Sequence, residues 1–124
     1  MKGTGLIAVA IAIFYACAAM ADTSALRGSW KGPWYIGMSS GIAVMEIAAD
    51  GSGNVTLTNL DEFGAKPVPL AKPTFDGKTF GFIATGANGA PLVMKLQLGE
   101  GGKQLRGNGK HAGFGARMEL QRIK

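Results

Sequence analysis

The stretch LVMKLQL, residues 92–98, has the two-residue period of a β-strand with one buried face. Successive side chains of a strand point to opposite sides of a sheet, so one face of this segment carries only large apolar residues: Leu92, Met94, Leu96 and Leu98. Shorter runs with the same period occur at residues 43–47 and 80–82. No segment after residue 22 has the period of about 3.6 residues that marks a helix, so the sequence predicts an all-β domain.

Turn signals separate these runs at short intervals. Clusters of Gly, Asp and Asn, which tolerate the positive φ angles of hairpin turns, lie at residues 50–54, 76–78, 86–89 and 99–103. The pattern predicts about eight strands, near residues 29–37, 41–48, 54–60, 68–75, 79–85, 91–98, 104–109 and 114–123. Short connections favour an antiparallel meander, and we expect a closed barrel rather than an open sandwich because closure removes exposed edges. Pro67, Pro69 and Pro73 indicate that the fourth segment is irregular or lies at an edge.

Residues 1–21 have the layout of a secretory signal peptide: a positive start, an apolar run at residues 6–16, and the small-x-small sequence Ala19-Met20-Ala21. The apolar run is too short to cross a bilayer as a helix, which needs about 20 residues. We therefore expect cleavage after Ala21, a periplasmic or secreted location, and no membrane span after cleavage. Lipid attachment at Cys17 is disfavoured by the bulky residues before it.

After cleavage, residues 22–124 form a chain of a length typical of one domain. The only cysteine leaves with the signal peptide, so this domain contains no disulfide. A nucleic-acid-binding protein is expected to carry a cluster of basic residues, whereas the Lys and Arg residues of 22–124 are scattered, with no run of four or more. We expect no nucleic-acid partner and a basic surface that is simply solvated.

Three short motifs suggest chemistry, but a turn or loop explains each of them better. Residues 37–41, GMSSG, match the nucleophile elbow of hydrolases at Ser39, yet that elbow needs a strand-to-helix turn and β patterns flank this one. Residues 50–54 resemble the start of a calcium loop, but residues 55–60 read as a strand. His111 is the only histidine, and we expect it in a loop or on the surface, without an orienting partner. The sequence predicts no catalytic residue, no metal site and no cofactor.

The two ends of this region resemble those of a known group of β-barrels. Residues 26–30, LRGSW, open the first strand with Gly28 and Trp30, and residues 118–122, MELQR, place Arg122 on the last strand. This arrangement resembles the calycins, which include the lipocalins and avidin, and the resemblance implies that the strand-one tryptophan packs beside the C-terminal arginine. The region also resembles small secreted bacterial β-domains, found alone or fused in front of peptidase and hydrolase domains, which mostly have no assigned activity.

Arg122 is predicted to face the same side of its strand as two apolar residues, Met118 and Leu120. In a closed barrel the first and last strands are neighbours, so the guanidinium is expected to lie across the ring of Trp30 near one barrel end.

The predicted inward residues are numerous for a barrel made from so short a chain. Those that either line a ligand cavity or fill the interior are Trp34, Met45, Phe80, Phe82, Met94 and Met118. An eight-stranded barrel is just wide enough for either arrangement, and a filled interior is the expectation for this length.

The sequence predicts a monomeric, non-catalytic binding or protein-interaction domain whose partner is a small apolar ligand or an exported protein. The alternative is an inhibitor of a secreted peptidase that uses residues 22–25 as a flexible N-terminal arm. A hydrolase is the least favoured function, since no nucleophile and base are coupled in the sequence.

Overall fold

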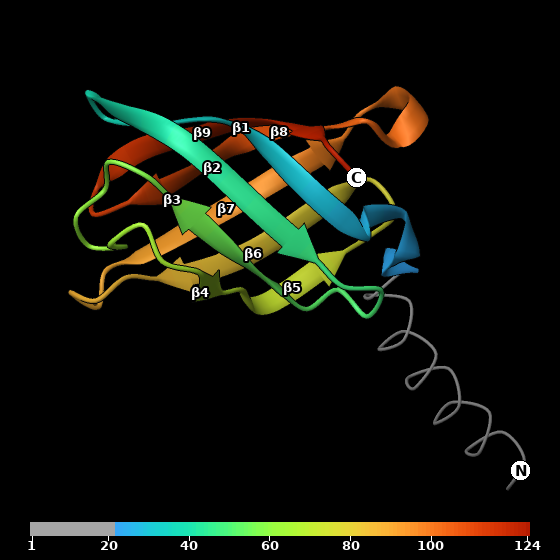
Figure 1. Ribbon diagram of the computed structural model, residues 1–124, viewed down its shortest axis with the longest axis horizontal. Coiled ribbons are helices and arrows are strands. Elements are labelled where there is room, and N and C mark those ends of the chain that lie inside the picture. The colour runs from blue at the N-terminus through green and yellow to red at the C-terminus, as the bar shows by residue number, and fades with distance from the viewer. Residues whose placement is uncertain (1–21) are drawn as a thin grey trace, which may run out of the picture.

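The structure is a computed structural model and describes residues 22–124. The signal peptide expected at residues 1–21 lies outside the described residues. Nine antiparallel strands form one sheet that curls into a nearly closed barrel (Figure 1). The strands are β1 (Gly28–Ile36), β2 (Ser39–Ile47), β3 (Gly53–Leu57), β4 (Val68–Pro69), β5 (Ala71–Phe75), β6 (Thr79–Thr85), β7 (Pro91–Leu98), β8 (Gln104–His111) and β9 (Phe114–Arg122). Two short 3-10 helices, η1 (Thr23–Leu26) and η2 (Glu100–Gly102), complete the fold.

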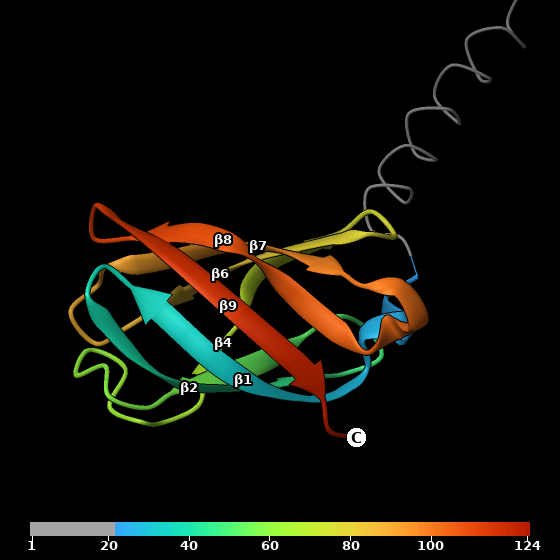
Figure 2. The same cartoon turned by 90° about the horizontal axis from the view of Figure 1, so that it is seen from above.

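The strand order is β4-β3-β2-β1-β9-β8-β7-β6-β5, so the first long strand pairs with the last. Trp30 lies opposite Arg122 and Trp34 lies opposite Met118 in this pairing. Every other neighbouring pair joins strands that follow each other in sequence, as the predicted meander requires. Figure 2 looks onto the outer side of β9, β8 and β1, where the closure is visible.

The seam of the barrel lies at β4 and β5, the two edges of the sheet. The sequence predicts one strand over residues 68–75, but the structure divides this segment at Leu70, which gives nine strands instead of eight. Pro69 and Pro73 have no N–H to donate, and the pairing of β5 with β6 shifts register between Ala71 and Thr74. The expectation of an irregular edge segment is correct.

One continuous apolar cluster occupies the barrel interior. On the apolar face predicted for residues 92–98, Leu92, Met94 and Leu96 are fully buried, whereas Leu98 at the strand end is only partly buried and packs against the cluster. Full burial of one large aliphatic or aromatic side chain contributes roughly 1.5–3 kcal/mol. Without a disulfide in residues 22–124, this burial is the main source of stability.

Glycines allow neighbouring strands to approach closely, and Gly32 and Gly107 are two examples. A Cβ on Gly32 would lie 1.9 Å from the carbonyl oxygen of Glu119, and one on Gly107 would lie 2.0 Å from that of Lys95. No side chain fits so close to a neighbouring backbone, so β1 and β8 approach their neighbours only because these positions are glycine.

Candidate functional site

The six residues predicted to line a cavity or fill the interior belong to the core. Trp34, Met45, Phe80, Phe82, Met94 and Met118 are each at most 2% exposed and lie in the same apolar cluster. Trp34 also uses its polar atom, because its Nε1–H donates to the carbonyl oxygen of Thr58 at 2.9 Å. These side chains therefore pack the interior, the arrangement expected for a short chain.

One end of the barrel is closed around Trp30 and Arg122, and we call it the Trp30 end. The ring of Trp30 is fully buried, and its Nε1–H donates to the carbonyl oxygen of Leu26 at 2.9 Å. The Cζ atom of Arg122 lies 4.3 Å from the centre of the Trp30 ring, a cation–π distance. Helix η1 covers this end and seats Leu26 in the core.

The guanidinium of Arg122 is satisfied by backbone carbonyls rather than by an acid. Its Nε–H donates to Gly102 at 2.9 Å, and its two terminal nitrogens donate to Arg27 and Ala25. A charge that faces the interior needs such acceptors, because burying it unpaired would be costly. Arg122 thus joins the last strand to both 3-10 helix regions.

We call the opposite end of the barrel the His111 end. The prediction that His111 lies in a loop or on the surface without an orienting partner is wrong. His111 is 3% exposed, not on the surface, and it has the orienting partner that the sequence did not reveal. Its Nε2 lies 2.9 Å from Oε2 of Glu62, and its Nδ1 lies 3.2 Å from the carbonyl oxygen of Pro91. Because both ring nitrogens face oxygen acceptors, only the doubly protonated ring donates to both.

The loop between β3 and β4 covers the His111 end. Phe63 is buried there and meets the imidazole edge-on, with ring centres 6.0 Å apart and planes at 69°. The carbonyl oxygen of Glu62 accepts a hydrogen bond from the N–H of Ala87 at 2.7 Å, which connects this loop to the turn after β6. The hydrogen bond from His111 lowers the pKa of the Glu62 carboxyl below its ordinary value. The lowered pKa favours the ionised form of Glu62, the form that only accepts hydrogen bonds.

The remaining candidate motifs form turns. Ser39 is exposed at the start of β2, directly after the hairpin turn at Gly37 and Met38. Asp50 accepts hydrogen bonds from the backbone N–H and the hydroxyl of Ser52, at 2.9 and 2.6 Å, and so stabilises the turn between β2 and β3. These contacts agree with the hairpin interpretation of both motifs.

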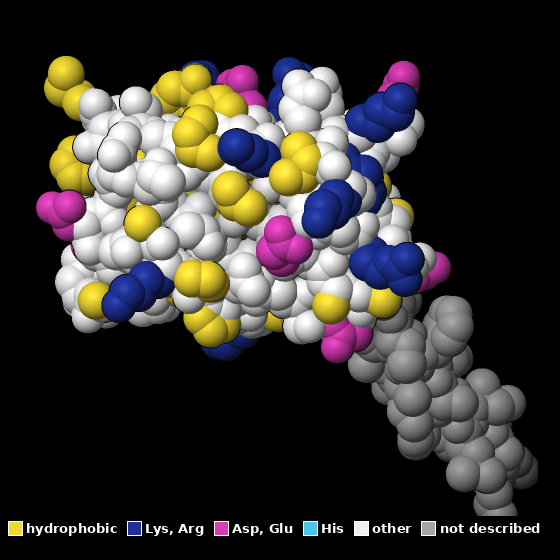
Figure 3. Space-filling model, in the orientation of Figure 1, with side chains coloured by type: hydrophobic (Ala, Val, Ile, Leu, Met, Phe, Trp, Pro, Cys, Tyr) yellow, Lys and Arg dark blue, Asp and Glu magenta, His cyan; other side chains and the backbone are white. Residues whose placement is uncertain are grey.

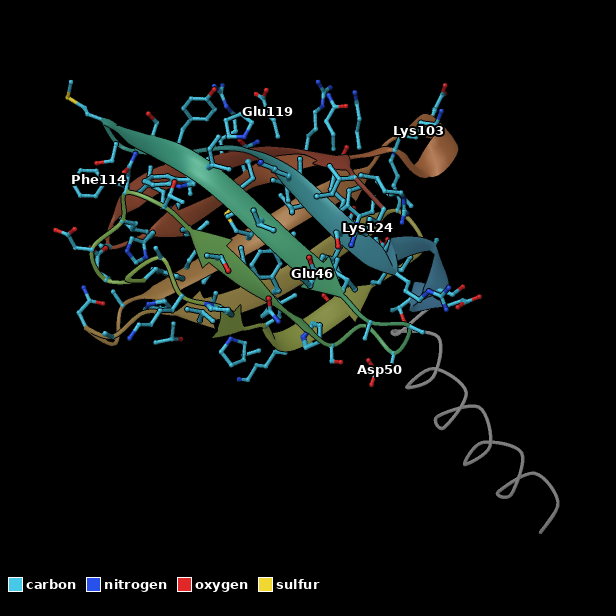
Figure 4. All side chains as sticks on the ribbon, in the orientation of Figure 1. Glu46, Asp50, Lys103, Phe114, Glu119 and Lys124 are labelled. Atoms are coloured by element: carbon cyan, nitrogen blue, oxygen red, sulfur yellow. The ribbon has the colours of Figure 1, made fainter. Side chains whose placement is uncertain are left out.

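Glu46 and Glu119 lie on the outer side of the sheet and have separate partners. Glu46 accepts from the hydroxyl of Ser29 at 2.7 Å, whereas Glu119 lies 3.3 Å from Nε of Arg117. Figure 4 shows Glu119 pointing away from the barrel on the outer side of β9. The described contacts do not couple the two carboxylates to each other.

The segment predicted to be a flexible N-terminal arm is folded against the barrel. Thr23 is 7% exposed and donates from its hydroxyl to the carbonyl oxygen of Ala49 at 2.6 Å. Asp22 caps η1 by accepting from the N–H of Ser24 at 3.0 Å, and this hydrogen bond lowers its pKa. Residues 22–25 are therefore part of the closed Trp30 end.

A hollow of about 960 Å³ lies on the outer side of β7, β8 and β9. Its cations are Lys78, Lys95, Arg106 and Arg117, and between them lie the carboxamides of Gln97, Gln104 and Asn108. We call this hollow the basic groove. Glu119, which lines the groove, lies on the upper side of the molecule in Figure 4.

Strand register gathers these cations although they are scattered in the sequence. Lys95 lies opposite Asn108, which lies opposite Arg117, while Gln97 lies opposite Arg106. Outward side chains that are far apart along the chain thus become neighbours on one face. The register thus places cations that are scattered in the sequence, and exposed in the structure, around one hollow.

The charges of the two parts of the chain differ in sign. Residues 78–119 contain six Lys or Arg and two Asp or Glu, whereas residues 22–77 contain four Lys or Arg and six Asp or Glu. In the space-filling view, the Lys and Arg side chains lie mostly toward the upper right, and hydrophobic side chains are scattered in small groups (Figure 3).

Within residues 22–124, no group of three or more His, Cys, Asp or Glu residues is arranged to hold a metal ion. Nor does a helix in this part of the chain have the length and apolar character needed to span a membrane.

Comparisons with known proteins inform the fold only. No protein-family model matches the chain, and no curated protein matches it. Among solved structures, that of a redesigned β-barrel is similar, with a TM-score of 0.64 and 18% sequence identity over 85% of this chain and 97% of that chain. This likeness, together with the nine antiparallel strands, shows that the chain folds as a nearly closed all-antiparallel β-barrel.

Proposed function

We propose that this chain is an exported, non-catalytic binding domain that recognises its partner with the outer surface of the barrel. The observation that carries the proposal is the contrast between a packed interior and a hollowed, polar exterior. Large apolar side chains occupy the interior, and the basic groove lies outside on β7, β8 and β9. Ligand sites are usually concave and present a few well-placed polar groups.

The surroundings of His111 support the absence of catalysis. A general base needs a ring nitrogen that is free to accept the proton of a nucleophile. Here one nitrogen is held by Glu62 and the other by the carbonyl oxygen of Pro91. A histidine with both nitrogens engaged, beneath a loop that buries Phe63, fits a structural role better than a catalytic one.

The packed interior also favours one class of partner over another. The sequence is compatible with two kinds of partner, a small apolar ligand or an exported protein. Because the fully buried interior side chains include two tryptophans and several methionines, an apolar ligand would have to displace core residues. A partner that stays outside the barrel, whether protein or polymer, needs no such displacement.

Peptidase inhibition gains no support from the N-terminal segment. An arm that reaches into a peptidase must be free, whereas Thr23 and Leu26 are buried against the barrel. Releasing them would expose Leu26 and remove the acceptors of Arg122 at Ala25 and Arg27. The inhibitor therefore remains an alternative that no described contact favours.

The test is affinity capture from periplasmic extract with three immobilised proteins: the wild type, Lys95→Gln/Arg106→Gln and Lys66→Gln/Lys72→Gln. Each double variant loses two positive charges. Only Lys95→Gln/Arg106→Gln, the groove variant, changes residues that line the basic groove. We expect bound material, identified by mass spectrometry for proteins, glycans and small molecules, to be lost with the groove variant only. A small apolar molecule retained stoichiometrically by all three proteins in native mass spectrometry would contradict binding through the outer surface.

A further inference from the structure

We propose that the basic groove binds an acidic polysaccharide, a polymer of sugars that carry carboxylate groups. This inference rests on the proposed function, since it assigns a chemical class to the partner of the outer surface. Residues 78–119 concentrate the positive charge of the domain on the part of the barrel that forms the groove. A surface with one excess sign attracts a polymer of the opposite sign and raises the rate of encounter.

The positions of the cations suit an extended anionic chain. Lys95 and Arg106 lie on neighbouring strands at diagonal positions, because Lys95 pairs with Asn108 and Arg106 pairs with Gln97. Arg106 and Arg117 are related in the same way across β8 and β9. Diagonal neighbours on a sheet are about 7–8 Å apart at Cα, so the three cations form a spaced series and not one compact anion site. A polymer with a repeated carboxylate presents charges in such a series.

Between the cations, the groove offers groups that hydrogen-bond hydroxyls. The carboxamides of Gln97, Gln104 and Asn108 each provide both donors and an acceptor, which is the combination that sugar hydroxyls require. Glu119 lies 3.3 Å from Nε of Arg117 and opposite Arg106 in the strand pairing, and Glu100 also lines the groove. The four cations outnumber these two carboxylates, and within residues 22–124 Lys95 and Arg106 form no ion pair.

The groove is poorly suited to the other common polyanions. Single-stranded nucleic acid is usually held by bases stacked on exposed aromatic rings, and no aromatic residue lines the groove. Tyr35, an aromatic residue on the outer face, lies beneath Arg117, whose Cζ is 4.6 Å from the ring centre. A lipid surface needs exposed apolar side chains beside the cations, whereas Met38 and Phe114, the most exposed large hydrophobic residues, lie at hairpin turns outside the groove.

The test is isothermal titration calorimetry of the purified domain, residues 22–124, with oligogalacturonate as the acidic probe and dextran as the neutral control. We expect oligogalacturonate to bind, dextran not to bind, and added NaCl to weaken binding because ions screen the contacts. Lys95→Gln/Arg106→Gln should raise the Kd by about tenfold, a change typical of losing two favourable charge contacts. Lys66→Gln/Lys72→Gln, the matched control, should change the Kd by less than about twofold.

Three results would overturn the inference. They are absence of binding to oligogalacturonate, equal weakening by both double variants, and tighter binding of single-stranded DNA than of oligogalacturonate. The affinity capture from periplasmic extract does not depend on the choice of polymer. Its outcome therefore distinguishes the proposal of outer-surface binding from the assignment of an acidic polysaccharide. If a protein is captured through the groove while oligogalacturonate fails to bind, outer-surface binding stands and the polysaccharide assignment falls.

Discussion

At the Trp30 end of the barrel, one guanidinium donates to three backbone carbonyls, whereas at the His111 end one imidazole lies between a carboxylate and a single carbonyl. Both arrangements place a nitrogen-bearing side chain under a short covering segment, and His111 is buried whereas Arg122 is partly buried. They differ in how their charge depends on pH, because arginine stays charged in proteins whereas the Glu62 carboxyl can be protonated. One end is therefore closed by a permanent charge, and the other by a pair whose carboxylate must be ionised.

The substitution expected to destabilise the protein most is Trp30→Ala, at the Trp30 end. Removing a fully buried tryptophan should lower the free energy of unfolding by about 3–5 kcal/mol, because it leaves a cavity and an unpaired Leu26 carbonyl. Urea denaturation followed by circular dichroism measures the loss. Trp30→Phe, which keeps an aromatic ring, should lose less; equal losses in the two variants would mean that ring volume does not matter at this end.

Arg122→Lys tests whether the geometry of the guanidinium, and not only its charge, closes the Trp30 end. A lysine cannot reproduce the planar fork that reaches the carbonyls of Ala25, Arg27 and Gly102, so we expect a loss of about 2 kcal/mol. Arg106→Lys on the exposed outer face is the control and should be nearly neutral in the same denaturation experiment. A similar effect at both positions would contradict the role of the fork.

At the His111 end, Glu62→Gln should have a smaller effect, about 1 kcal/mol, because Glu62 is partly exposed and its pair is only one of the contacts of the loop. The loss should be local. Hydrogen exchange is expected to accelerate at the amide of Ala87, which donates to the Glu62 carbonyl, and not at the amide of Ile123, which donates to Ser29 at the other end. Asp61→Asn, an exposed neighbour, is the control; uniform acceleration throughout the barrel would show that the two ends are not independent.

The smallest effect expected is a difference in pH dependence between the ends. The pKa of Glu62 is lowered in the folded protein by its hydrogen bond from His111. A lowered pKa means that the stabilisation is present above the ordinary value of 4.5 and is lost as pH falls through the folded value. The stability difference between the wild type and Glu62→Gln should therefore shrink below about pH 4, whereas the difference for Arg122→Lys should not follow this titration. Melting temperatures measured from pH 3 to 6 in steps test this contrast, and parallel curves would contradict it.

The parts of the fold that follow from alternation were predictable, because the two-residue period maps directly onto the two faces of a strand. Residues 92–98 alone identify β7 and its buried side, and the pairing of β1 with β9 follows once the barrel closes. The division of residues 68–75 was not predictable in detail. Prolines mark an edge, but the position at which the chain leaves one edge and joins the other depends on tertiary packing around Leu70.

The burial of His111 had a signal in the sequence that local reasoning missed. Leu105, Gly107, Gly109 and His111 follow one another at the strand period, so extending β8 by one step places the histidine on the inner face. Its partner Glu62 could not be predicted, since the two residues are 49 positions apart and meet only because a loop covers the barrel end. Sequence neighbours are a poor guide to the partners of a buried side chain.

The basic groove was partly predictable by a different route. The turn between β8 and β9 places His111 opposite Phe114, and positive φ at Ala112 and Gly113 fits the two-residue hairpin turns that set register. With that register, Asn108 falls opposite Arg117 and Arg106 falls opposite Glu119. Counting runs of basic residues along the chain misses a cluster that forms across strands.

The Arg122 contacts have a mechanical consequence. β1 begins and β9 ends at the same pole of the barrel, where the N–H of Ser29 donates to the carbonyl oxygen of Lys124 at 3.3 Å. A force that pulls residues 22 and 124 apart would load the hydrogen bond from Thr23 to Ala49 and then those that tie Arg122 to Ala25 and Arg27. Once these break, the ladder between β1 and β9 is loaded one bond at a time, in an unzipping geometry and not in shear. The same side chain that closes the barrel would thus set the force at which it opens.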